Sequence, residues 1–113
     1  RIQNEIPAEA GSLRGRRMKL LMIFCSEYLS EPVREALDGL KLNCSAEVPE
    51  VLGCNGPYKR MDTPAFPGTA NLFFVPVDDE RVEEVRGALV ALLDHCEEER
   101  CLRMIAVEAA PLI

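Results

Sequence analysis

The sequence has few aromatic residues and no long hydrophobic segment. It contains no tryptophan, four phenylalanines and two tyrosines in 113 residues, so aliphatic side chains must fill most of a core. Hydrophobic residues make up 48% of the chain, which is enough for one globular domain. The longest apolar run, residues 20–25, is far shorter than the roughly 20 residues of a membrane helix, and no secretory segment is visible. We therefore expect a cytoplasmic, single-domain protein.

An excess of positive charge is also absent. The net charge is −6, and the basic residues are concentrated in residues 1–17, which contain four arginines and two glutamates. The rest of the chain is acidic, and an acidic body would repel a phosphate backbone, which excludes nucleic acid as a partner. Residues 1–17 have turn-forming residues and no periodicity. They are predicted to be an N-terminal extension of a domain spanning residues 18–113.

The residues needed for catalysis are scarce. The chain has one histidine, His95, and a lone histidine with no obvious nucleophile partner does not make a catalytic triad. No phosphate-binding or dinucleotide-binding fingerprint is present. We therefore predict that the protein is not an enzyme.

The chain has five cysteines, an odd number, and no secretory segment. Both facts favour reduced thiols over a disulfide framework. Cys25 and Cys44 lie in predicted strands and are expected to be small buried residues. Cys54 is expected to be exposed. It could be a redox sensor, but no basic residue adjoins it in the sequence to activate its thiol.

The hydrophobic pattern predicts strands and helices in a regular order. Residues 19–25 form a continuous apolar strand, and Ser30 is a good N-cap for a helix that follows. A second strand over residues 42–52 is interrupted by Pro49, which places it at a sheet edge. After a long loop at residues 53–70, a second apolar strand at 72–75 leads into a helix capped by Asp78 or Asp79 and reaching Cys96. Residues 102–107 form the last strand.

Two parts of this pattern repeat. Residues 31–37 resemble residues 83–89, and in each copy a strong apolar strand precedes the helix. Two strand-helix-strand units of this kind predict an α+β, ferredoxin-like βαββαβ fold. In that fold a four-stranded antiparallel sheet carries both helices on one face.

With these elements in place, the chain resembles the PII-like group of small signalling proteins. The resemblance rests on residues 18–24 as the opening strand, 33–37 in the first helix, 50–56 at the exit into the long loop, and 77–85 at the start of the second helix. It implies a non-enzymatic homotrimer that binds a small ligand, often an adenine nucleotide, in clefts between subunits. It also implies that the long loop changes shape and contacts a partner protein. Where nitrogen-regulatory PII proteins have a basic phosphate-holding turn, this chain has Glu97, Glu98 and Glu99, which argues against the classical mode of ATP binding.

The long loop contains the candidate ligand residues. Lys59 and Arg60 form a basic island beside Tyr58, and Gly53 and Gly56 allow close approach of the backbone to an anion. Gly68 and Asn71 would shape the return side of the cleft. The alternatives are a solvated loop tip and ordinary turn chemistry before a strand.

A second hypothesis concerns metal. His95, Cys96 and Cys101 would bind zinc or copper if they came together, as in a CutA-type metal-tolerance trimer. Their spacing matches no standard motif, and Cys96 also continues the apolar stripe of the helix, so a core role explains it equally. A third hypothesis is an interaction module with no ligand. The sequence names no cofactor.

Overall fold

The computed structural model describes residues 17–42, 44–96 and 100–113. Its elements, in chain order, are β1 (Met18–Ser26), the 3-10 turn η1 (Glu27–Leu29), α2 (Ser30–Gly39), β2 (Ala46–Val51), β3 (Gly53–Asn55), β4 (Tyr58–Arg60), β5 (Ala70–Asp78), η2 (Asp79–Arg81), α3 (Val82–Val90), η3 (Ala91–His95) and β6 (Leu102–Ala109).

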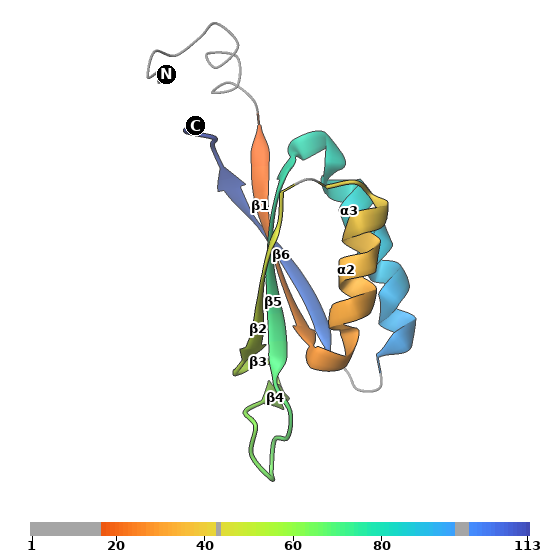
Figure 1. Ribbon diagram of the computed structural model, residues 1–113, viewed down its shortest axis with the longest axis vertical. Helices are drawn as coiled ribbons and strands as arrows, with labels where there is room; N and C mark the ends of the chain where they lie inside the picture. The colour runs from red at the N-terminus through yellow and green to blue at the C-terminus, as the bar shows by residue number, and fades with distance from the viewer. Residues whose placement is uncertain (1–16, 43, 97–99) are drawn as a thin grey trace, which may run out of the picture.

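Four strands form one antiparallel sheet in the order β2-β5-β1-β6. The two long apolar strands, β1 and β5, lie at its centre, where each of them pairs with a strand on both sides. Helices α2 and α3 lie side by side on one face of the sheet (Figure 1). The predicted ferredoxin-like βαββαβ fold is therefore confirmed.

The internal repeat is visible in the backbone. Each copy runs from a central strand through a 3-10 turn into an α-helix, and the two junctions have nearly the same dihedral angles. Ser26 (φ −61°, ψ 149°) corresponds to Asp78 (φ −68°, ψ 147°), and Leu29 corresponds to Arg81. Similar local sequences thus adopt the same conformation twice.

The predicted helix caps were wrong in detail. The 3-10 turn η1 precedes α2, so Ser30 is the first helical residue, and its hydroxyl donates to the Glu27 carbonyl at 2.9 Å. Neither Asp78 nor Asp79 caps α3, which begins at Val82 after η2. The Asp79 carboxylate instead pairs with the Lys19 ammonium at 2.8 Å and ties η2 to β1.

The core lies between the sheet and the helices. Alternate residues of each central strand point toward the helices, as the pleat of a strand requires. The buried members from the strands and helices are Leu21, Ile23, Cys25, Phe73, Val75, Val77, Val33, Leu37, Val85 and Leu89. Beyond Leu89 the stripe predicted for the second helix is only partly buried. Leu92 and Cys96 still pack against the core, and η3 replaces the α-helix beyond Val90.

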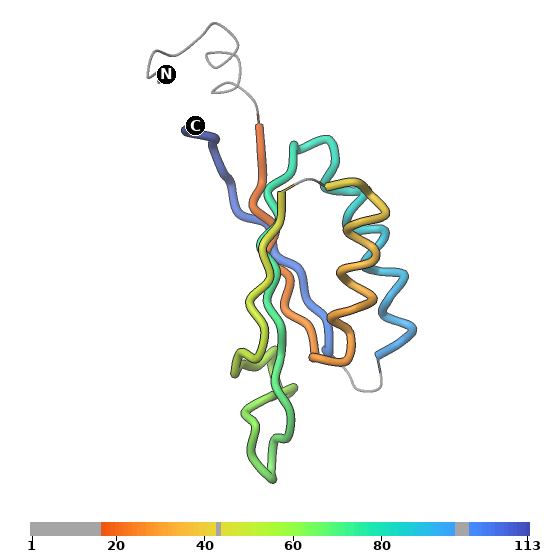
Figure 2. Tube along the Cα trace, in the orientation of Figure 1, coloured from red at the N-terminus to blue at the C-terminus, as the bar shows by residue number. Residues whose placement is uncertain are grey.

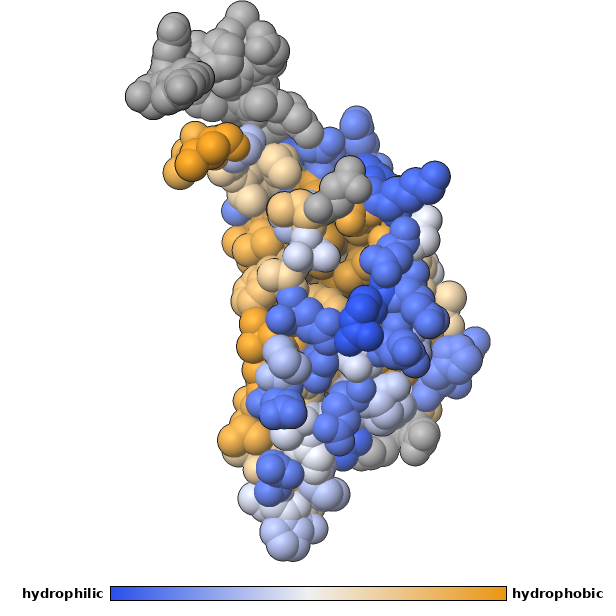
Figure 3. Space-filling model, in the orientation of Figure 1, coloured by the Kyte–Doolittle hydropathy of each residue, from blue (hydrophilic) through white to orange (hydrophobic). Residues whose placement is uncertain are grey.

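The other face of the sheet is apolar, and no helix from the described part of the chain lies on it. Leu20, Met22 and Phe24 of β1 are paired across this face with Pro76, Phe74 and Leu72 of β5. On the outer strands Val48, Ile105 and Val107 are 41%, 41% and 45% exposed. Figure 3 shows hydrophobic residues along the side of the molecule that faces away from α2 and α3. We call this surface the open face.

The second strand is an edge strand, as Pro49 predicted. Its register against β5 shifts between Val48 and Val51, and Glu50 adopts a positive φ of 58° within the irregularity. The strand begins at Ala46, later than predicted, so Cys44 precedes it and is exposed. The expectation that Cys44 is buried was therefore wrong. No helix among the described residues has the length and apolarity needed to cross a membrane.

Two valines of the same helix test the position of the core. Val85 is fully buried and Val90 is 47% exposed. Val85→Ala is expected to lower the free energy of unfolding by about 2 kcal/mol, because it removes buried methyl groups and leaves a cavity. Val90→Ala is the matched control and should change it by less than about 0.5 kcal/mol. Urea unfolding of both variants measures this, and equal effects would contradict the assigned core.

Candidate functional site

The long loop leaves the end of the sheet and contains a small hairpin. Strands β3 and β4 pair in the register Gly53↔Arg60, Cys54↔Lys59 and Asn55↔Tyr58. Gly56, at φ +66°, forms the turn between them. The loop therefore occupies the predicted residues, but it is more ordered than predicted, and it extends past the end of the sheet in Figure 2.

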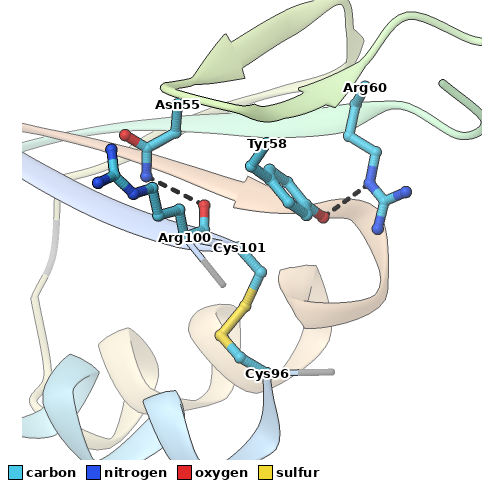
Figure 4. Close-up of a disulfide and its surroundings, with 6 residues drawn as sticks. All are labelled: Asn55, Tyr58, Arg60, Cys96, Arg100 and Cys101. Carbon is cyan, nitrogen blue, oxygen red and sulfur yellow. Dashed lines mark hydrogen bonds between the residues drawn. A yellow bond between two sulfur atoms is a disulfide. The ribbon is translucent and has the colours of Figure 1, made fainter. Parts of the chain in front are cut away.

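The hairpin is anchored to the start of β6 through Asn55. This side chain is 8% exposed, and its amide donates to the Arg100 carbonyl at 3.0 Å. Its oxygen accepts from Arg103 Nη1 at 3.2 Å. Tyr58 of β4 is also buried. Figure 4 shows the bond from Asn55 to Arg100 at the root of the hairpin. Both ends of a buried amide are thus satisfied by residues far away in the sequence, which fixes the root of the hairpin.

The two predicted loop glycines permit close contacts at this root. A Cβ at Gly53 would lie 2.9 Å from the ring of Phe24, so the absence of a side chain lets β3 rest on the open face. A Cβ at Gly56 would overlap Arg100 Nη1. Gly56 therefore brings the backbone close to the Arg100 guanidinium, whereas the sequence predicted close approach to an anion, which stays a prediction.

The predicted basic residues of β4 make contacts within the loop. The Arg60 guanidinium donates from Nε to the Tyr58 hydroxyl at 2.7 Å and from Nη1 to the Pro67 carbonyl at 2.9 Å. Lys59 lies over the ring of Phe66, 5.0 Å from its centroid. These contacts join the outgoing and returning sides of the loop.

Gly68 and Asn71 lie in different surroundings. A Cβ at Gly68 would be 3.1 Å from the Glu27 carboxylate. The Asn71 amide donates to Glu47 at 2.6 Å. Asn71 pairs with Cys25, whose side chain lies in the core, whereas Gly53 rests on the adjacent Phe24. Because adjacent strand residues point to opposite faces, Asn71 and Gly53 lie on opposite sides of the sheet.

Sequence reasoning missed Arg100 and Arg103. Both are exposed. At the hairpin root the structure brings Arg100 to Asn55 and Gly56, and Arg103 to Asn55. A signal was available for Arg103, because it is a charged residue on the same face of its strand as Ile105 and Val107. The acidic residues 97–99, which drew attention to this turn, lie outside the described residues.

Cys96 and Cys101 form a disulfide, so the expectation of five reduced thiols was wrong for these two. Their Cα atoms lie 5.9 Å apart, a proximity that spacing alone did not reveal. In this form their sulfurs are bonded to each other and are not metal ligands, and His95 is exposed. Among the described residues no group of three or more metal-ligating side chains is found.

The three remaining cysteines are free. Cys25 is buried, as predicted, and burial raises its pKa to about 12, so its thiol stays protonated and unreactive. Cys54 is exposed, as predicted.

A cavity lies at the other end of the sheet from the hairpin. It has a volume of about 410 Å³ and is lined by Arg17, Asp78, Asp79 and Glu80. Three of these four side chains are acidic, so this cavity is poorly suited to an anion. The positive charges at the hairpin root make that end of the molecule the better candidate.

Comparisons with known proteins agree with this architecture. No family model and no curated sequence matches the chain. Solved structures do match: CPII from Thiomonas intermedia K12 superposes with a TM-score of 0.62 at 11% identity, over 84% of this chain and 90% of that one. Its apo form gives a TM-score of 0.63 at 12% identity, over 82% and 89%. The chain has the PII-like fold.

A further match to the PII-like fold comes from Thermus thermophilus. The protein from this organism is described as a PII-like signalling protein. Its structure superposes with a TM-score of 0.56 at 12% identity, over 83% of this chain and 88% of that one. CPII, described as a nitrogen regulatory PII-like protein, was solved bound to ADP, AMP and bicarbonate. The resemblance predicted from the sequence is thus confirmed for the fold.

The contact between Asn71 and Glu47 predicts a pH dependence of stability. The Arg34 guanidinium, which donates to Glu47 at 3.0 and 2.9 Å, and the Asn71 amide hold the pKa of this carboxyl below its usual value. The pKa is lower in the folded state, so the stabilisation is present above pH 4.5 and is lost as the pH falls below it. Glu47→Gln should cost about 1 kcal/mol at neutral pH and nothing in acid.

Unfolding curves across this pH range measure the effect. Glu83→Gln is the control, because the Glu83 carboxylate is 76% exposed and pairs with Arg86 on the helix surface. A Glu47→Gln penalty that stays constant from neutral pH to about pH 3, well below the usual carboxyl range, would contradict the assignment.

Proposed function

We propose that this chain is a PII-like regulatory protein, not an enzyme, that binds a small anionic ligand of the adenine nucleotide type at the root of its long loop. The observation that carries the proposal is the placement of Arg100 and Arg103 beside Gly56 and Asn55. The ligand-bound state of CPII, which shares this fold, supports the choice of ligand class.

The chemistry of the root suits a phosphate or carboxylate. Guanidinium groups form paired, charge-assisted hydrogen bonds to such anions. Gly53 and Gly56 keep the backbone free of side chains there, and Lys59 and Arg60 of β4 add positive charge along the hairpin. Gly68 and Asn71 each face a carboxylate, so in this proposal they support the return side of the loop while the arginines hold the anion.

The loop provides a means of signalling. A ligand that binds the docked hairpin more tightly than the undocked one shifts the loop toward the docked state. The loop exposes Met61 and Phe66, at 39% and 40%, as contact surface for a partner protein. Ligand binding would then favour or block that partner by changing the position of these residues.

The open face supports a homotrimer, in which ligand clefts would lie between subunits. A sheet with helices on one face leaves its other face uncovered, and here that face is apolar across all four strands. Extended apolar surfaces of this kind are typical of protein interfaces. A second and a third copy of the chain are the occupants that we propose.

Ligand binding is tested by thermal unfolding and calorimetry with ADP, ATP, AMP and bicarbonate. We expect at least one nucleotide to raise the melting temperature. Arg100→Ala should weaken that nucleotide about tenfold, because one charge-assisted contact is lost. Arg86→Ala, an exposed arginine on α3 that pairs with Glu83, is the matched control and should bind normally.

The double variant Lys59→Ala, Arg60→Ala tests the role of the hairpin separately. We expect weaker ligand binding and loss of the ligand effect on the loop. Normal binding by the double variant would remove β4 from the site, and no response of the wild-type protein to any nucleotide or to bicarbonate would overturn the ligand class.

Assembly is tested by a matched pair of valines. Val107 on the open face and Val90 on α3 are 45% and 47% exposed. Wild-type protein should sediment at roughly three times the 12.6 kDa chain mass. Val107→Glu should dissociate the assembly, because it would bury an unpaired charge, whereas Val90→Glu should not. A monomeric wild-type protein at micromolar concentration would contradict the trimer.

A further inference from the structure

The Cys96–Cys101 disulfide closes a short ring between η3 and β6. The two residues are five positions apart, and a ring of this size restricts little of the unfolded chain. The other three cysteines are free, and two of them are exposed, so the chain is not stabilised by a disulfide framework. The bond therefore acts mainly on its immediate surroundings.

Those surroundings are the anchor of the hairpin. Arg100, the residue before Cys101, offers its carbonyl to Asn55 at 3.0 Å and places its guanidinium against Gly56. The Cys101 carbonyl accepts from the Ser26 amide at 2.9 Å. Figure 4 shows the disulfide, Arg100 and Asn55 in succession from the helical layer to the hairpin.

The backbone of Arg100 is in an uncommon conformation. Its φ of +63° lies in the left-handed region, which a residue with a Cβ rarely adopts. Cys101 is fixed by burial and by its bond to Cys96, so the closed ring helps to hold Arg100 in this conformation. Opening the ring removes that constraint, and a return of Arg100 to negative φ would turn its carbonyl away from Asn55.

We propose that Cys96 and Cys101 are a reversible redox site that controls the docking of the β3–β4 hairpin. The oxidised form keeps the hairpin on Arg100, and the reduced form releases it. The reaction partner is a dithiol reductant of the thioredoxin class. The control of hairpin docking is argued from the contacts above. A change in ligand affinity on reduction would follow only if the proposed function holds.

The exchange can be written with all atoms accounted for. A thiolate of the dithiol attacks Cys96 Sγ, which is more accessible because Cys101 is 0% exposed. The bond between the two protein sulfurs breaks, and Cys101 leaves as a thiolate that takes a proton. The second thiol of the reductant then attacks the mixed disulfide and releases Cys96. The protein gains two electrons and two protons, and the dithiol becomes a disulfide.

Hydrogen exchange tests the proposal without any ligand. Full-length protein is compared in oxidised form and after reduction by dithiothreitol, with peptides covering residues 53–60. Reduction should speed exchange of these amides about tenfold or more and leave β1 and β5 unchanged. Cys96→Ser should exchange like the reduced protein under both conditions. Cys44→Ser, which alters an exposed free cysteine, should respond like wild type.

Two results would overturn the proposal: no reduction of the folded protein by dithiothreitol, or equal exchange of residues 53–60 in both states. If Cys96→Ser does not fold, the comparison of oxidised and reduced wild type still decides. A hairpin that responds to reduction in a protein that binds no nucleotide would leave this inference standing and refute the proposed ligand.

Discussion

The pairing of β1 with β5 is the interaction on which the rest of the structure depends. Met18 to Ser26 pair without interruption with Asp78 to Ala70, and both strands are apolar on both faces. One face of the pair needs the two helices to cover it, and the other becomes the open face. Each strand then passes into a 3-10 turn and a helix, so one central contact determines the positions of both repeats.

The β3–β4 hairpin, which precedes β5 in the chain, shows how a small polar contact organises a long loop. Asn55 satisfies its donor and acceptor on Arg100 and Arg103, both in or next to the last strand of the sheet. The loop is therefore attached to a segment 45 residues away, while its outer part is held by contacts of Arg60 and Lys59. The root of the loop is thus held by the last strand, and its outer part is held by contacts within the loop.

Much of the fold was predictable because it follows from local patterns. The apolar strands, the two helices, the edge position of the strand with Pro49 and the repeat all depend on residues close together in the sequence. The caps were mispredicted, since the 3-10 turns before Ser30 and Val82 compete with side-chain capping. Cys44 was misplaced because the edge strand begins at Ala46.

The candidate site was less predictable, because its members come from distant segments. The sequence identified the loop and Gly56, but only the fold brings Arg100 and Arg103 to it. The fold also separates Asn71 from Gly53. Asn71 pairs with Cys25 and Gly53 lies against Phe24, and these two neighbours in β1 point to opposite faces of the sheet. The Cys96–Cys101 bond depends on a proximity of the two residues that no spacing rule supplied.

The position of Phe24 has a consequence of its own. One edge of its ring supports Gly53, and its strand position belongs to the open face. A molecule that packs on that face beside Phe24 therefore presses on the same ring that the hairpin rests on. In the proposed trimer, self-association and loop position would be linked through this one aromatic side chain, so a substitution of Phe24 would affect both.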